Sequence, residues 1–243
     1  MVAVLGLGTE YESEGNDKTD LRLPAEQLRL LKKLYAVNKN IVLVVENGSA
    51  LELKEPDGLC RAVVEAWYPG DRGGDALADI LFGKVSPSGR LPIGFPESTD
   101  DLPPFDDYDT ENGRTYMYRT VKPLYEFGYG LSYTEFEYSS ITGNKKSVRI
   151  KVKNTGSYNS DEVVQLYIDS AGMPKQPQYR LKGFKRIHLK VGESAEVSFE
   201  LNEESFSLFD EDGKRKLFQG EYTVYIDGHM PDEYSPSLKI HLF

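Results

Sequence analysis

The sequence predicts an α/β domain, built on a mostly parallel sheet, followed by an all-β antiparallel sandwich. Up to about residue 100, apolar runs of strand length alternate with segments of helical periodicity, the order that gives parallel sheets. From about residue 136, apolar and polar residues alternate with a period of two between polar turns, which is typical of a sandwich. We expect a partial α/β domain over 1–100, a linker rich in Pro, Gly and Tyr over 101–135, and a β-sandwich over 136–243.

Each element of the first domain has its own signal. The apolar run 2–7 predicts a buried strand, and a helix opens near Pro24, with an apolar face repeating at helical spacing through Tyr35. The β-branched run 41–45 predicts a strand buried on both faces, and 61–67 a third strand. After a glycine-rich turn, a helix over 75–82 ends at Gly83.

The position of the first strand is unusual. A buried parallel strand needs neighbouring strands on both sides and helices over both faces. No residues before Val2 supply them. The chain is therefore expected to begin in the middle of a domain.

The second half predicts strands and no helix. Five segments show the alternation: 147–153, 162–168, 181–187, 195–201 and 221–226. Most of their charged residues are expected to point outward, and we find no catalytic cluster among them. In the linker, 127–133 interleaves aromatic residues with glycine, a pattern that either stacks on sugar rings or packs in a seam between domains. We favour the seam.

Composition excludes several classes of protein. A net charge of −10 argues against nucleic acid and anionic membranes as partners. The single cysteine, Cys60, cannot form an intrachain disulfide and has no histidine near it in sequence, so a catalytic thiol is not expected. The turn 70–74 lacks a phosphate-binding fingerprint, and no cofactor or metal is expected. No signal peptide is visible, which leaves cytoplasm and periplasm both open.

The most informative segment is the acidic loop 8–18, which holds Glu10, Glu12 and Glu14 directly after the first strand. Ligands of open α/β sheets bind beyond the carboxyl ends of the strands. A carboxyl group flanked by another carboxylate there can act as a general acid. The alternative is a solvated acidic loop without chemistry.

Several ordered motifs resemble glycoside hydrolase family 3, which includes β-glucosidases and β-xylosidases. The resemblance begins with Glu-Ser-Glu-Gly-Asn-Asp-Lys at 12–18 and continues through Trp-Tyr-Pro-Gly at 67–70 and Pro-Ser-Gly-Arg-Leu-Pro at 87–92. It includes Glu-Phe-Gly-Tyr-Gly-Leu-Ser-Tyr at 126–133. The last part resembles the fibronectin type III-like, immunoglobulin-like domain that closes many members, with cues at 152–156, 181–184 and 220–224.

The resemblance implies retaining hydrolysis of a β-linked glucoside or xyloside oligosaccharide, without a cofactor. Glu14 best matches the family's general acid/base, and Glu12 is the runner-up. The nucleophile belongs to a barrel domain absent from this chain, which would be supplied in cis or in trans. Asp17 is expected to organise the loop, and Lys18 replaces an arginine, which weakens any clamp there. Alone, the chain is expected to be inactive. The alternative is a non-catalytic module that binds carbohydrate or a partner.

Overall fold

The computed structural model describes residues 1–170 and 177–242, and the chain forms two compact units. Unit 1 consists of Met1–Lys84, Ile93–Tyr108 and Thr120–Tyr125. Unit 2 consists of Val85–Pro92, Asp109–Arg119 and Glu126–Phe243. The chain between the α/β elements and the sandwich thus contributes segments alternately to the two units.

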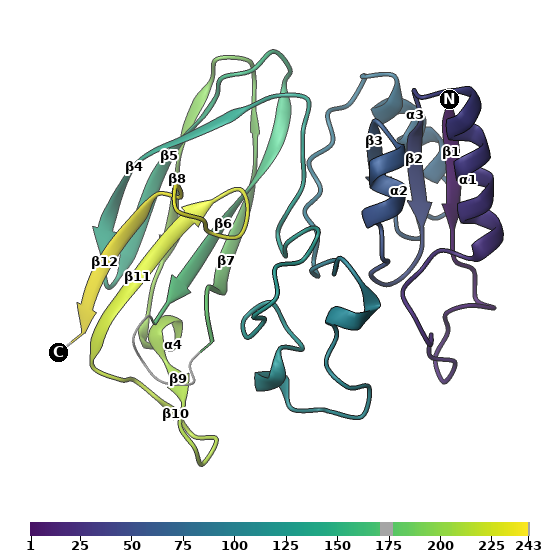
Figure 1. Ribbon diagram of the computed structural model, residues 1–243. Helices are drawn as coiled ribbons and strands as arrows, with labels where there is room; N and C mark the ends of the chain where they lie inside the picture. The colour runs from purple at the N-terminus through teal and green to yellow at the C-terminus, as the bar shows by residue number, and fades with distance from the viewer. Residues whose placement is uncertain (171–176, 243) are drawn as a thin grey trace. The chain divides into compact units, whose positions relative to one another are not determined.

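Unit 1 is built on a three-stranded parallel sheet in the order β1-β2-β3 (Figure 1). Its strands are β1 (Val2–Gly6), β2 (Val42–Glu46) and β3 (Ala62–Glu65). The helices that alternate with them are α1 (Ala25–Val37), α2 (Lys54–Leu59) and α3 (Gly73–Leu81). The α/β class predicted from the alternation is confirmed.

The central strand and the first helix follow from their sequence patterns. In β2, Leu43, Val44 and Val45 have no exposed surface, as expected of an apolar run in the middle of a parallel sheet. Helix α1 begins directly after Pro24, whose fixed φ suits a helix start and whose missing N–H costs nothing there. Leu31 on its apolar face is fully buried.

Three details of unit 1 differ from the sequence prediction. Strand β1 lies at the edge of the sheet and is not buried on both faces. Ala3 is buried, whereas Val2 and Val4 are 50% and 55% exposed. Helix α2 was missed because it contains Pro56 and a glycine, but proline is tolerated in a first turn. Helix α3 starts at Gly73, inside the predicted turn.

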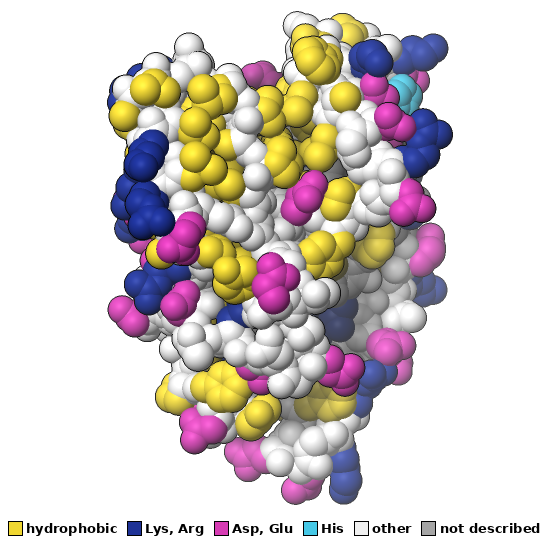
Figure 2. Space-filling view, turned by 90° about the vertical axis from the view of Figure 1, so that its right-hand side faces the viewer, with side chains coloured by type: hydrophobic (Ala, Val, Ile, Leu, Met, Phe, Trp, Pro, Cys, Tyr) yellow, Lys and Arg dark blue, Asp and Glu magenta, His cyan; other side chains and the backbone are white. Residues whose placement is uncertain are grey.

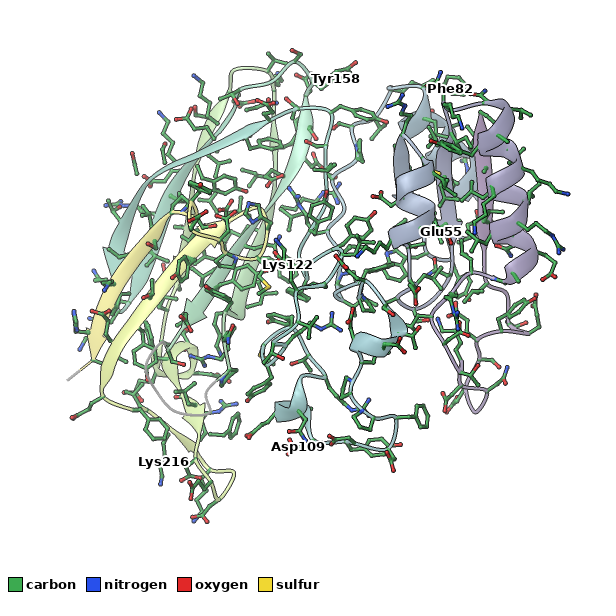
Figure 3. The ribbon with its side chains drawn as sticks, in the orientation of Figure 1. Glu55, Phe82, Asp109, Lys122, Tyr158 and Lys216 are labelled. Atoms are coloured by element: carbon green, nitrogen blue, oxygen red, sulfur yellow. The ribbon has the colours of Figure 1, made fainter. Side chains whose placement is uncertain are left out.

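The helices of unit 1 carry an exposed outer surface. Lys32 of α1 pairs with Glu55 of α2 at 2.7 Å, and Phe82, just after α3, is 83% exposed (Figure 3). Acidic side chains are spread over the face seen in Figure 2, among apolar ones. Within 1–170 and 177–242, no helix is long and apolar enough to cross a membrane.

Unit 2 is an antiparallel sandwich (Figure 1). One sheet has the order β12-β11-β6-β7 and the other β4-β5-β8, with a small hairpin β9-β10. The strands are β4 (Phe136–Asn144), β5 (Ser147–Asn154), β6 (Ser160–Asp169), β7 (Arg180–Leu189), β8 (Ser194–Glu200), β9 (Leu208–Phe209), β10 (Arg215–Lys216), β11 (Gly220–Asp227) and β12 (Ser237–Leu242). All five predicted strands are present, and the predicted all-β class is confirmed.

The core of the sandwich lies between the inward faces of the two sheets. Val148, Ile150 and Val152 alternate inward along β5, facing Val164, Leu166 and Ile168 of β6 within one apolar cluster. The expectation of no helix in this half was wrong. The short helix α4 (Glu203–Phe206) is held by a reciprocal capping box between Asn202 and Ser205, and it buries Phe206 in the core.

A buried polar cluster ties residues 85–92 to the sandwich within unit 2. Arg90 Nη2 lies 2.6 Å from Glu162 Oε2, and the Tyr138 hydroxyl donates to Glu162 Oε1 at 2.6 Å. Arg90 Nη1 also donates to the carbonyl of Gly130. Glu162 is 1% exposed and is an exception to the expectation that most charged residues of this half point outward. A paired and hydrogen-bonded charge can be buried where an isolated one cannot.

The remaining irregular chain contains two short 3-10 helices, η1 (Thr99–Asp101) and η2 (Thr110–Asn112). The aromatic residues of 127–133 pack within unit 2. Phe127 stacks on Tyr116 with ring centroids 4.0 Å apart, and Tyr133 tilts against Tyr158, labelled in Figure 3, at 5.7 Å.

Candidate active site

The candidate site lies at the carboxyl edge of the parallel sheet of unit 1. Three connections leave the sheet at this edge: the loop after β1, the turn 47–49 after β2, and the segment 66–69 after β3. Figure 1 shows the first of these, in purple, leaving the lower end of β1. Because parallel strands end at the same edge, side chains far apart in sequence meet here.

Glu12, in the loop after β1, accepts hydrogen bonds from the connections after β2 and β3. Its Oε1 accepts hydrogen bonds from the Gly48 N–H and, at 2.6 Å, from the Tyr68 hydroxyl. Its Oε2 accepts from the Ser49 hydroxyl at 2.5 Å. The Lys18 ammonium lies 3.3 Å from the same oxygen. The Glu12 carboxylate therefore anchors the acidic loop to the ends of β2 and β3.

These contacts set the ionisation of Glu12. Burial alone would raise the pKa of this carboxyl, since its side chain is only 12% exposed. The hydrogen bonds from Ser49, Tyr68 and Gly48, with the Lys18 charge, outweigh burial and lower the pKa from 4.5 to about 2. The hydrogen bond that the Tyr68 hydroxyl donates to Glu12 raises the pKa of Tyr68 to about 12. Glu12 is thus an anion throughout the neutral range and has no proton to give there.

Glu14 lies at the tip of a tight turn. The Asn16 N–H donates to the Ser13 carbonyl at 3.0 Å, and Gly15 adopts a φ of +76°, the left-handed conformation that glycine takes without strain. Glu14 is exposed. It makes none of the hydrogen bonds or ion pairs found in the described part of the chain. The turn presents this carboxyl to solvent while Glu12, two residues earlier, fixes the loop.

The two charged residues that follow, Asp17 and Lys18, play different parts in the loop. Lys18 donates to Ser49 Oγ at 2.5 Å and to the Ala50 carbonyl at 3.3 Å, so it clamps the loop without an arginine fork. Asp17 is exposed and takes part in no hydrogen bond or ion pair among residues 1–170 and 177–242. The loop is organised by Glu12 and Lys18, and the role expected of Asp17 falls to Glu12.

The sequence analysis missed three residues of this edge: Ser49, Tyr68 and Glu65. Ser49 follows a buried strand, where the polar turn Asn-Gly-Ser was a usable signal. Tyr68 belongs to the Trp-Tyr-Pro-Gly motif, but only the fold shows that its hydroxyl reaches Glu12. Glu65 sits at the end of β3, and burial, together with the nearby Glu12 charge, raises its pKa to about 7. The N–H of Trp67 opposes that rise.

Comparison with known proteins identifies the two parts of the chain. The model of the glycosyl hydrolase family 3 C-terminal domain matches residues 1–133, more than half of the chain. The chain belongs to glycosyl hydrolase family 3. A fibronectin type III-like domain matches residues 162–229, which lie in the sandwich of unit 2. The family and both domain classes predicted from the motifs are confirmed.

Relatives in the family carry the same region within longer proteins. Thermostable beta-glucosidase B of Acetivibrio thermocellus is 38% identical over 247 residues, which is 93% of this chain and 33% of that enzyme. The Xylan 1,4-beta-xylosidase of Xylanibacter ruminicola is 39% identical over 218 residues, 87% of this chain and 25% of the relative.

Solved structures confirm the fold of the whole chain. The GH3 beta-glucosidase of Bifidobacterium adolescentis matches with a TM-score of 0.88 and 35% identity, over 98% of this chain and 38% of that one. The beta-glucosidase of Listeria innocua in complex with glucose matches with a TM-score of 0.85 and 29% identity, over 100% of this chain and 36% of that one. The family 3 chain described here therefore spans about a third of the length of these relatives.

Two further observations bound the chemistry of this family 3 chain. Within the described ranges, no three His, Cys, Asp or Glu side chains gather as a group that could hold a metal ion. The carboxyl groups at the carboxyl edge of the sheet include Glu12, held as an anion, Glu14, exposed, and Glu65, half-buried. The edge can supply a proton-transfer group and a fixed negative charge.

Proposed function

We propose that this chain is the C-terminal part of a retaining β-glycosidase and supplies its general acid/base, Glu14. The observation that carries the proposal is that two glutamates of the same loop have different surroundings. Glu12 is hydrogen-bonded on both oxygens and has a pKa of about 2, so it cannot protonate a leaving group near neutrality. Glu14 is exposed on a turn that Glu12 and Lys18 fasten to the sheet.

The chemistry assigned to Glu14 has two steps. A carboxylate nucleophile on the longer protein's other domain attacks the anomeric carbon, and the glycosidic oxygen leaves with the proton of Glu14. The Glu14 carboxylate then takes a proton from water, whose oxygen attacks the same carbon and releases the nucleophile. Because this chain holds only one of the two groups, we propose that it depends on a barrel domain in cis or in trans.

The substrate class is proposed from the relatives. The two relatives named above are a beta-glucosidase and a xylan 1,4-beta-xylosidase, so a β-linked glucoside or xyloside oligosaccharide is the expected substrate. The residues that would choose between the two sugars are proposed to lie on the missing barrel.

The decisive experiment uses a chimera. The chain replaces the matching 38% of the Bifidobacterium adolescentis enzyme, and 4-nitrophenyl β-glucoside and β-xyloside are the substrates. We expect activity in the chimera and none in the chain alone. Glu14→Gln should lower kcat/KM, which reports the first step alone, by about 10²–10⁴-fold for a poor leaving group, and much less for 2,4-dinitrophenyl glucoside, whose leaving group needs no protonation.

The matched control is Glu10→Gln, an exposed glutamate of the same loop. It should leave both substrates nearly unaffected. If Glu14→Gln and Glu10→Gln behave alike, or if the loss caused by Glu14→Gln does not depend on the leaving group, Glu14 is not the acid/base. Turnover by the chain alone that Glu14→Gln abolishes would overturn the dependence on a barrel.

A second candidate function is carbohydrate binding without catalysis. Tyr133 and Tyr158 form an exposed aromatic pair on unit 2, 41% and 46% exposed, of a kind that can stack on a sugar ring. Titration of the chain with cello- and xylo-oligosaccharides tests it. Saturable binding that survives loss of Glu12 and Glu14 but fails on changing Tyr129 or Tyr133 would favour this function.

A further inference from the structure

The end of β3 contains a carboxyl group whose surroundings the reaction does not explain. Glu65 Oε1 accepts a hydrogen bond from the Trp67 N–H at 2.9 Å. Glu65 Oε2 is buried and has no hydrogen-bond partner among the described residues. A buried, unpaired oxygen is far less costly on a neutral carboxylic acid than on a carboxylate.

The hydrogen bond from Trp67 holds an unusual turn. Trp67 has a φ of +52°, in the left-handed region where a bulky side chain costs about 1–2 kcal/mol. Such a conformation persists only where surrounding contacts enforce it. Two contacts do so here: the Glu65 carboxyl on the backbone, and the ring of Phe95, which meets the Trp67 indole edge-on at 6.0 Å.

The turn decides where Tyr68 points. The reversal at Trp67 directs the next side chain back across the sheet edge, where the Tyr68 hydroxyl donates to Glu12 Oε1 at 2.6 Å and lies 3.2 Å from the Leu7 carbonyl. Leu7 directly precedes the acidic loop, and Glu12 lies within it. A shift of Tyr68 would therefore remove one contact at each place and leave Glu12 with Gly48, Ser49 and Lys18 alone.

We propose that Glu65 is a positioning residue for the acidic loop: its carboxyl fixes the Trp67 turn, which sets the Tyr68 hydroxyl on Glu12 and thereby holds the turn that presents Glu14. The inference rests on the proposed role of Glu14, but each contact in the chain from Glu65 to Glu12 can be tested without any catalytic assay. Glu65 touches no reacting atom in this scheme and acts only through Trp67, Tyr68 and Glu12.

The test follows the ionisation of Glu12 in the whole chain by ¹³C NMR of the glutamate carboxyl groups between pH 2.5 and 8. In the wild-type protein Glu12 should scarcely titrate in this range, because its pKa is about 2. Glu65→Ala removes the acceptor for the Trp67 N–H and should raise the pKa of Glu12 by about one unit or more, a tenfold change in proton affinity. Glu65→Gln keeps an acceptor oxygen at the same place and should leave the pKa of Glu12 unchanged.

The matched control is Glu46→Ala, which removes a partly buried carboxyl at the end of the neighbouring strand β2. It should not move the Glu12 titration. The proposal is overturned if Glu65→Ala leaves Glu12 as in wild type, or if Glu65→Gln shifts it as much as Glu65→Ala does.

A measurement on the wild-type chain covers the case in which Glu65→Ala does not fold. The Trp67 amide should exchange with solvent slowly at pH 5, because it is hydrogen-bonded to Glu65. Exchange at the rate of an unstructured peptide would overturn the proposal. Tyr68→Phe completes the set: it should raise the pKa of Glu12, and an unchanged pKa would break the last link. If these results hold while the chimera with Glu14→Gln stays active, the proposed function fails and the positioning of the loop stands.

Discussion

Replacing Glu12 by glutamine should destabilise unit 1 in a manner that depends on pH. The substitution keeps the size of the side chain but removes the charge that Lys18 and three hydrogen-bond donors face. The amide group of the new side chain would also point N–H donors at the Tyr68 and Ser49 hydroxyls or at the ammonium of Lys18. The Glu12 side chain is 12% exposed, so solvent screens little of this loss.

The magnitude follows from the pKa of Glu12. Its value is lowered from 4.5 to about 2, and each pKa unit corresponds to 1.36 kcal/mol, so the interaction contributes about 3 kcal/mol at pH 7. The pKa is depressed in the folded state, so the contribution is complete above the unfolded value and is lost as pH falls through the folded one. By linkage it decreases to about 2 kcal/mol at pH 3.5.

The assay is urea unfolding followed by tryptophan fluorescence. Trp67 is the single tryptophan of the sequence and lies in unit 1, so its signal reports this unit and not the sandwich. A loss of about 3 kcal/mol should lower the urea midpoint by about 2 M if m is about 1.5 kcal/mol/M. The matched control is Glu14→Gln, an exposed position where the change should stay within about 0.5 kcal/mol.

Two results would refute this reasoning. One is a Glu12→Gln midpoint at pH 7 equal to that of Glu14→Gln. The other is a Glu12→Gln penalty that is the same at pH 3.5 as at pH 7, because a loss without pH dependence would come from packing and not from the charge.

Three further predictions follow from the structure. Burial raises the pKa of Glu65 from 4.5 to about 7, so the free energy of unfolding of the wild-type protein should fall by at most about 3 kcal/mol as pH rises from about 4.5 to above 7. Glu65→Gln should abolish that fall in the Trp67 unfolding assay, and an unchanged pH profile would contradict the prediction. Arg90→Ala leaves the buried Glu162 without its ion pair and should lower the free energy of unfolding of unit 2, measured by calorimetry, by about 3–5 kcal/mol. Arg149→Ala removes an exposed arginine and should have no measurable effect, and equal effects of the two substitutions would disprove the role of burial. In Gly130→Ala the new Cβ would collide with the Gly89 carbonyl and lie 3.2 Å from Arg90 Cδ, so the melting temperature of unit 2 should fall by several degrees. A melting temperature within about 1 °C of wild type would show that the chain around Gly89 moves aside freely.

Patterns along the chain were enough to predict most of the local elements and the family, although helices α2 and α4 were missed. The β-branched run of β2, the helical face around Leu31 and the alternation along β5 depend on spacing of two to four residues, so each could be predicted before any fold was known. The motif at 12–18 likewise singled out Glu12 and Glu14 as the two candidates for the general acid/base, and that role stays a prediction.

The difference between the two glutamates arises from contacts that the fold alone creates. Glu12 meets Gly48 and Tyr68, which are 36 and 56 residues away in sequence, and no local pattern encodes those hydrogen bonds. The same holds for Arg90 and Glu162, 72 residues apart, which bring residues 85–92 into the sandwich unit. Propensity and periodicity arise from neighbours along the chain, whereas the ionisation of a carboxyl depends on whatever the fold places within a few ångströms of it.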